Sequence, residues 1–159
     1  MLKRNRLLMG LVASAAVLGA LGFPAAIAQT NHREFFQGRG IAQGSAFARG
    51  RNANLSLTLD GENFGLEMTE PQASGTRNQT PSRVQYRGVI VRRNREPGGP
   101  NNFILSVRVR SFDSSDNFRV ISNTTGTCRI EVFDARVTYS NCNAIADDSS
   151  TRFLGLEQF

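Results

Sequence analysis

The sequence of 159 residues contains no Trp, two Tyr, two Cys and one His. The single histidine, His32, leaves a serine nucleophile without its usual partner base, which argues against the commonest hydrolase mechanism. Two cysteines are also too few for a thiolate zinc site. From these scarce residue types we predict no catalytic residue, no metal ligand and no cofactor.

Lysine is equally scarce, because Lys3 is the only one and every basic residue after Arg6 except His32 is arginine. The planar guanidinium of Arg binds phosphate, sulfate or carboxylate through two hydrogen bonds, which Lys does not match. A genome-wide preference for Arg would produce the same composition. Composition alone therefore leaves both explanations open.

The N-terminus has the pattern of a secretory signal peptide. Three basic residues precede an apolar run over residues 7–23, and Ala26-Ile27-Ala28 supplies the small residues that a signal peptidase accepts. The run is short for a bilayer span. We predict a signal peptide over residues 1–28, export to the periplasm or the extracellular space, and no transmembrane segment in the mature chain.

The remaining chain has a suitable length for one domain. Residues 29–38 are mostly polar, so we predict a flexible N-terminal segment there and a single β-domain over residues 39–159. Cys128 and Cys142 form an even pair in a chain with an export signal, which predicts one disulfide.

The clearest structural pattern is a hairpin over residues 54–68. Apolar and polar residues alternate on both sides of the segment 60–63, which is typical of two half-buried strands around a turn. A two-residue loop at Gly61-Glu62, with Gly where positive φ is needed, fixes the register and puts all six apolar side chains on one face. The predicted cross-strand pairs are Leu59 with Phe64, Leu57 with Leu66, and Leu55 with Met68.

Two further hairpins are predicted at residues 84–112 and 127–141. In the first, the apolar run 89–91 breaks the alternation, which indicates a bulge or a strand covered on both faces. In the second, a two-residue loop at Asp134-Ala135 would set Cys128 opposite Asn141 instead of Cys142. A disulfide needs closer Cβ atoms, so we favour a bulge near Ser140 over a three-residue loop.

Shorter strand patterns occur at residues 41–49, 118–122 and 151–159, and no stretch after the leader has helical periodicity. Short strands at intervals of roughly ten residues are typical of all-β domains. We therefore predict an all-β fold, an antiparallel sandwich or barrel of eight to nine short strands.

Paired carboxylates are the remaining route to catalysis, because a hydrolase of this kind needs two of them in one cleft. Acidic residues are scattered through the predicted strands, and the sequence brings no two together. The candidates are Asp60, Glu62, Glu67, Glu131 and Glu157. The acidic turns at residues 113–117 and 147–148 are explained by turn chemistry without calcium.

The most suggestive feature for function is a cluster of arginines. Eight of them lie between Arg83 and Arg119, with only three acidic residues among them. If the two long strands are neighbours, one exposed face could attract a polyanion, which could be acidic polysaccharide, lipid headgroups or nucleic acid. The predicted anion-binding residues are Arg87, Arg93, Arg108 and Arg110. A solvated face whose arginines discourage edge-to-edge pairing is the alternative.

The predicted partner is acidic polysaccharide or another polyanion. Single-stranded nucleic acid is the least favoured polyanion, because aromatic residues that stack on bases are sparse in this segment. These features favour a binding or structural module of the cell envelope over an enzyme. One alternative is a small-molecule carrier, a closed barrel with an apolar interior. Its lining would include Leu57, Leu66, Leu105 and Val107. A carboxylate-dependent hydrolase is the second alternative.

An outer-membrane barrel is a further alternative, since such barrels often finish in an aromatic strand. Its lipid-facing residues here would be Phe153, Gly155, Glu157 and Phe159, and a mid-strand Glu and Gly fit that role poorly. Aromatic belts are also missing, because the chain has no Trp and two Tyr.

Overall fold

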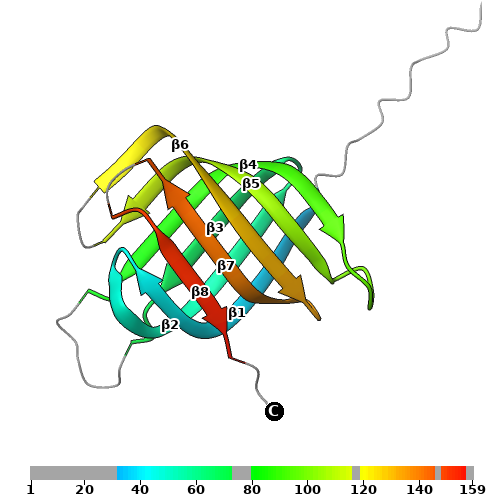
Figure 1. Ribbon diagram of the computed structural model, residues 1–159, viewed down its shortest axis with the longest axis horizontal. Helices are drawn as coiled ribbons and strands as arrows, with labels where there is room; N and C mark the ends of the chain where they lie inside the picture. The colour runs from blue at the N-terminus through cyan, green and yellow to red at the C-terminus, as the bar shows by residue number, and fades with distance from the viewer. Residues whose placement is uncertain (1–31, 73–79, 116–118, 146–147, 157–159) are drawn as a thin grey trace, which may run out of the picture. The chain divides into compact units, whose positions relative to one another are not determined.

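The computed structural model describes residues 32–72, 80–115, 119–145 and 148–156, so the predicted signal peptide lies outside the described residues. Eight β-strands form the described structure (Figure 1). They are β1 (Arg33–Gly44), β2 (Phe47–Asp60), β3 (Asn63–Thr69), β4 (Arg83–Arg95), β5 (Phe103–Ser114), β6 (Arg119–Phe133), β7 (Arg136–Ala144) and β8 (Thr151–Gly155). These ranges contain no helix with the length and hydrophobicity that a bilayer crossing requires.

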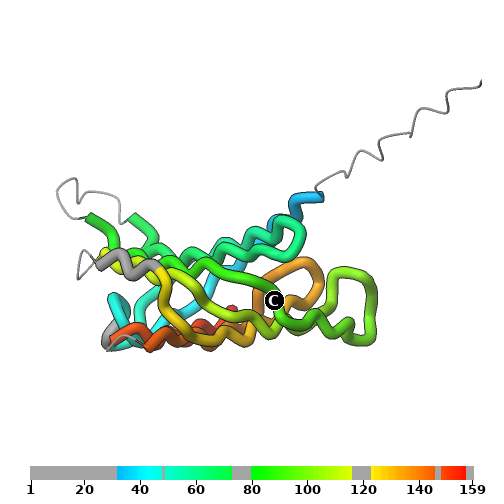
Figure 2. Tube along the Cα trace, turned by 90° about the horizontal axis from the view of Figure 1, so that it is seen from above, coloured from blue at the N-terminus to red at the C-terminus, as the bar shows by residue number. Residues whose placement is uncertain are grey.

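The strands close into a barrel. Each strand pairs with the next in antiparallel orientation, and β8 returns to pair with β1. In Figure 1 the red β8 runs beside the blue β1, and Figure 2 shows β8 on the wall opposite β3. The predicted all-β antiparallel fold is confirmed as a closed barrel. It has eight strands because residues 119–133 form the single strand β6, where the sequence patterns suggested two.

The hairpin of β2 and β3 is confirmed in its register. Leu59 lies opposite Phe64, Leu57 opposite Leu66, and Leu55 opposite Met68. Gly61 has a φ of 58°, as a two-residue loop with Gly at its first position requires. All six apolar side chains are buried.

The hairpin of β6 and β7 contains the predicted disulfide. Its loop is Asp134-Ala135, and the register shifts by one residue so that Cys128 lies opposite Cys142 with their Cα atoms 4.1 Å apart. The extra residue is Thr138, whereas the sequence suggested a bulge near Ser140. This bulge at Thr138 lets Val137 and Ser140 both face the interior, because the two residues between them are pushed outward.

The expectation of a flexible segment over residues 29–38 is wrong for residues 33–38, which form the first half of β1. Phe36 lies opposite Leu57 and is buried, so this half of the strand belongs to the core. The strand predicted at 41–49 is likewise divided by a turn at Ser45-Ala46, with positive φ at Gly44 and Ser45. Small residues at the inward positions hid the alternation of β1 from sequence analysis.

Apolar side chains fill the barrel interior in one continuous cluster. Leu57, Leu66 and Leu105 are fully buried, and Val107 is 3% exposed. Phe153 on β8 also faces the interior and is fully buried. This direction is the reverse of the lipid-facing one that an outer-membrane barrel would give to Phe153.

Glycine allows the barrel walls to meet where the ring closes. A Cβ on Gly38 would clash with the carbonyl oxygen of Val137 and would lie 3.2 Å from the Phe153 ring. A Cβ on Gly40 would clash with the carbonyl oxygen of Leu154. The backbone of β1 therefore approaches β7 and β8 to a distance that a larger residue does not permit.

The ring closes in two different ways along this line, which we call the seam. The short strand β8 pairs with β1 only from Gln43 to Gly40. On the N-terminal side of Gly40, β1 pairs directly with β7 through a parallel bridge between Gln37 and Arg136. The outer surface is therefore indented where β8 ends.

Candidate functional site

The barrel brings arginines of β4 and β5 together on its outer surface. Arg87 lies opposite Ser111, and Arg110 occupies the extra position of a bulge beside Ser111. Arg108 lies opposite Val89, two residue pairs further along the same two strands. All three arginines are exposed. Three of the four predicted anion-binding residues therefore share one region of the surface.

Arg93, the fourth predicted residue, lies elsewhere. It is opposite Leu105, which is fully buried, so it belongs to the inner face of β4 at one end of the barrel. Its guanidinium carbon lies 3.9 Å from the centre of the Phe103 ring. The same guanidinium donates two hydrogen bonds to Glu34, of 2.8 and 2.9 Å, and these hold the pKa of Glu34 below its ordinary value despite some desolvation. Arg93 therefore closes one end of the core.

A bulge in β4 explains why Arg93 turns inward. The register shifts between Ile90 and Arg92, which sets Arg92 opposite the exposed residue Ser106. The broken alternation at residues 89–91 signalled a bulge, but it did not tell which of the following arginines would face outward. Arg92 is thus the residue that sequence analysis missed. We call the outward set of Arg87, Arg92, Arg108 and Arg110 the Arg face.

Acidic residues next to the Arg face are already engaged by other arginines. Asp113 accepts a hydrogen bond of 2.5 Å from Arg83, and Glu131 forms an ion pair of 2.9 Å with Arg129. Within the described part of the chain, no arginine of the Arg face forms an ion pair. The Arg face is therefore an uncompensated positive surface.

A second unusual surface lies on the outer face of the barrel along the seam, where large apolar side chains are exposed. Ile41 on β1 lies opposite Leu154 on β8, and Leu154 lies opposite Tyr139 on β7, so the three form one row across the seam. The exposed fraction of the apolar side chains here ranges from 41% to 60%. We call this set the seam surface, and it consists of Phe35, Ile41, Phe133, Leu154 and Leu156.

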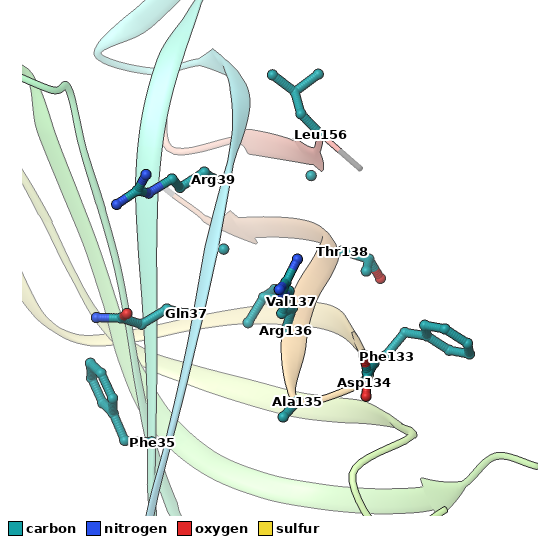
Figure 3. A pocket seen from close by; sticks show the side chains of 12 residues that line it. Phe35, Gln37, Arg39, Phe133, Asp134, Ala135, Arg136, Val137, Thr138 and Leu156 are labelled. Carbon is teal, nitrogen blue, oxygen red and sulfur yellow. The ribbon is translucent and has the colours of Figure 1, made fainter. Parts of the chain in front are cut away.

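A groove of about 610 Å³ runs along the seam surface between β1 and β7. Figure 3 shows Gln37 and Arg39 on the β1 side and Arg136 on the β7 side. Leu156 lies at one end of the groove and the turn at 134–135 lies at the other. The groove is open to the outside, and its lining includes the buried residues Gly38 and Val137.

The turn at the end of the groove is held from outside the hairpin. Asp134 and Ala135 both have positive φ, 48° and 60°, which is unusual for Ala. The buried side chain of Asn102 accepts a hydrogen bond of 2.7 Å from the backbone N–H of Asp134 and donates one of 3.0 Å to the carbonyl of Pro97. Asn102 therefore joins the 134–135 turn to the connection between β4 and β5.

Tyr86 ties opposite walls of the barrel together through the interior. Its hydroxyl donates a hydrogen bond to the backbone carbonyl of Ser149 and lies 2.8 Å from the hydroxyl oxygen of Thr151. Burial raises the pKa of Tyr86 well above its ordinary value, although the hydrogen bond with Thr151 opposes the shift. Tyr86 is therefore neutral and fixes the start of β8.

The acidic candidates for hydrolysis that the structure describes lie on the outside of the barrel. Asp60 and Glu67 line one hollow of about 310 Å³, and Glu67 accepts a hydrogen bond of 3.2 Å from Gln85 and lies 3.5 Å from Arg83. Glu131 is paired with Arg129 on another strand. Glu62 is exposed at the 61–62 turn, and Glu157 lies outside the described residues.

Comparison with protein families, with curated proteins and with solved structures finds no match to this chain. The fold and the surfaces nevertheless define a class. This protein is an eight-stranded, antiparallel, closed β-barrel with a packed apolar interior. Its candidate sites are the Arg face and the seam surface, both on the outside.

Proposed function

We propose that this protein is an exported binding module of the cell envelope or the extracellular space, and that it binds an anionic polymer through the Arg face. The observation that carries the proposal is the placement of four outward arginines on two neighbouring strands, without an ion pair to any described residue. A guanidinium binds sulfate, carboxylate or phosphate through two parallel hydrogen bonds. A row of them suits a chain of repeated anions.

Acidic polysaccharide suits the Arg face better than single-stranded nucleic acid does. Bases bind to protein grooves largely by stacking on exposed aromatic rings. Tyr86 and Phe112, two of the aromatic residues in this segment, are buried in the core with their ring centres 5.1 Å apart. The described strands around the Arg face therefore offer charge without a stacking platform.

A binding site on the outer surface also agrees with the packing of the interior, which is filled by apolar side chains. The residues that would line a carrier cavity, Leu57, Leu66 and Leu105 among them, pack against one another in the core cluster. An anionic polymer needs no cavity, because it binds along a surface.

The first test measures retention of the mature protein on immobilised heparin as a function of salt. The test variant has Gln in place of Arg87, Arg92, Arg108 and Arg110, and we expect it to elute at a much lower salt concentration. Each lost contact with a phosphate- or sulfate-type anion reduces the slope of log affinity against log salt concentration by about one. All four side chains are exposed, so the substitutions leave the core unchanged.

The matched control carries the same loss of net charge elsewhere. Arg33, Arg49, Arg51 and Arg129 are also exposed and lie on other strands, so their replacement by Gln should change the slope by less than about one. If the control variant and the Arg-face variant lose retention equally, net charge alone drives the binding and the proposed site is wrong. The proposal also fails if the Arg-face variant elutes with the unsubstituted protein.

A further inference from the structure

The seam surface gathers most of the exposed apolar side chains of the described residues. It holds five of the large apolar residues that are exposed in the described ranges, and the others are Val91 and Ile145. Single exposed apolar residues are ordinary on a protein surface, but a contiguous group marks an interaction site. The strand register makes Ile41 and Leu154 direct cross-strand neighbours, and Phe35, Phe133 and Leu156 line the groove of the same seam. The backbone N–H of Leu156 then donates a hydrogen bond to the carbonyl of Arg39 in the next row.

Arginines border this apolar surface on both sides. Arg152 lies opposite Gln43 on one side of the Ile41–Leu154 row, and Arg39 and Arg136 line the groove on the other side. The guanidinium of Arg152 lies over the ring of Tyr139, 5.6 Å from its centre. Considering the described residues alone, none of the three arginines forms an ion pair, and Asp134 is the only acidic residue lining the groove.

This charge pattern argues against a second copy of the chain as the partner. A two-fold interface brings the same surface of both copies together. The three arginines of one seam surface would then face those of the other, with Asp134 as the only compensating charge in the groove of each copy. Like charges placed together across an interface oppose association. The partner should instead combine an apolar layer with negative charge.

We propose that the seam surface docks on an anionic lipid bilayer. Phe35, Leu154 and Leu156 enter the boundary between headgroups and acyl chains, as apolar residues of peripheral proteins do. Arg39, Arg136 and Arg152 bind the lipid phosphates around them. The barrel thus lies on the membrane along its seam, with the β4–β5 strands and their Arg face free for a different ligand.

The experiment is co-sedimentation of the mature protein with vesicles of phosphatidylcholine alone or mixed with phosphatidylglycerol. The unsubstituted protein is expected to bind the mixed vesicles and to bind the neutral ones far more weakly. Each arginine near an anionic membrane strengthens binding about fivefold, so the combined change of Arg39, Arg136 and Arg152 to Gln should weaken it roughly 100-fold. Changing Leu154 and Leu156 to Ser should weaken it at least about tenfold, because apolar area is lost from the interface.

Two controls separate docking at the seam from general attraction. Val91→Ser removes an exposed apolar side chain far from the seam in sequence and on another strand, and it should leave vesicle binding unchanged. Changing Arg87, Arg108 and Arg110 to Gln removes the same charge from the Arg face, and it should weaken vesicle binding less than fivefold.

Three results would overturn the proposal. They are equal binding to neutral and anionic vesicles, an Arg-face variant that loses as much binding as the seam variant, and self-association of the free protein that the Leu154→Ser, Leu156→Ser variant abolishes. Far-ultraviolet circular dichroism of each variant verifies that the barrel is intact. The vesicle result does not depend on heparin binding, so this proposal and the proposed function can fail separately.

Discussion

Glu34 and Arg93 show how one ion pair can serve the core and the surface together. The guanidinium covers the Phe103 ring while it holds the carboxylate, so the pair shields the end of the apolar interior from water. About a third of each side chain remains exposed, 33% for Arg93 and 29% for Glu34. Solvent therefore screens the attraction, and we expect the pair to contribute roughly 1 kcal/mol.

The lowered pKa of Glu34 gives that contribution a definite pH dependence. A carboxylate whose pKa is lower in the folded state stabilises the fold above its unfolded pKa, near the ordinary value of 4.5, and this stabilisation is lost as the pH falls through the folded pKa. Glu34→Gln should therefore lower the free energy of unfolding at pH 7 and change it little near pH 3. Urea unfolding at both pH values measures this.

Glu62→Gln is the matched control for that measurement, because Glu62 is exposed in a turn and has no ion pair to a described residue. It should leave the free energy of unfolding nearly unchanged at both pH values. A Glu34→Gln variant with the same deficit at pH 3 as at pH 7 would mean that packing, and not charge, is what the substitution removes.

The β6–β7 hairpin carries two features that depend on each other. The Thr138 bulge brings Cys128 opposite Cys142, and the disulfide then fixes the shifted register. Both cysteines face the packed interior. The disulfide therefore joins the two strands on their inner face, while the turn of the hairpin lies at the end of the groove.

Removal of this disulfide should destabilise the barrel without changing its topology. The two cysteines are separated by 14 positions, and closing a loop of this size restricts the unfolded chain by about 3 kcal/mol. We expect Cys128→Ala with Cys142→Ala to lower the free energy of unfolding by about that amount, with the far-ultraviolet circular dichroism of the folded protein retained. Unsubstituted protein that unfolds identically with and without reductant would contradict the prediction.

How much the sequence could predict differs from one hairpin to another. The β2–β3 register follows from the sequence because strict alternation and a Gly-initiated loop allow only one pairing with all apolar residues inside. In β4–β5 the register shifts twice, and each shift reverses which residues face outward. A bulge is chosen by contacts with neighbouring strands, which sequence patterns of one strand do not contain. This is why Arg93 was predicted in place of Arg92.

The seam was invisible to sequence analysis for a related reason. Gly38 and Gly40 carry no side chain that would mark their positions as inward, so β1 lacked the alternating pattern of the other strands. In the sequence, the exposed apolar residues Leu154 and Leu156 indicate only a last strand with irregular alternation. Their meaning depends on closure of the ring, which places Leu154 beside Ile41 and Leu156 at the groove.

Closure of the ring makes a specific prediction about glycine. Gly38→Ala would put a methyl group against the carbonyl of Val137 and the ring of Phe153, so the walls must separate. We expect a loss of at least about 2 kcal/mol in the free energy of unfolding. Gly65→Ala is the matched control, because a Cβ there meets no atom within 4 Å, and it should be neutral or stabilising by up to about 1 kcal/mol. Thermal unfolding of both variants compares them, and an equal loss in each would show that the seam is not tightly packed.

The position of β8 also affects how the chain reaches its folded state. Its partner β1 is synthesised before the other described strands, and the second edge of β1 is covered only when residues 151–155 are available. During that interval β1 and β7 present unpaired N–H and C=O groups that can recruit strands of other molecules. Truncation before residue 151 should therefore leave the edges of β1 and β7 open and favour aggregation, which light scattering of the truncated protein measures.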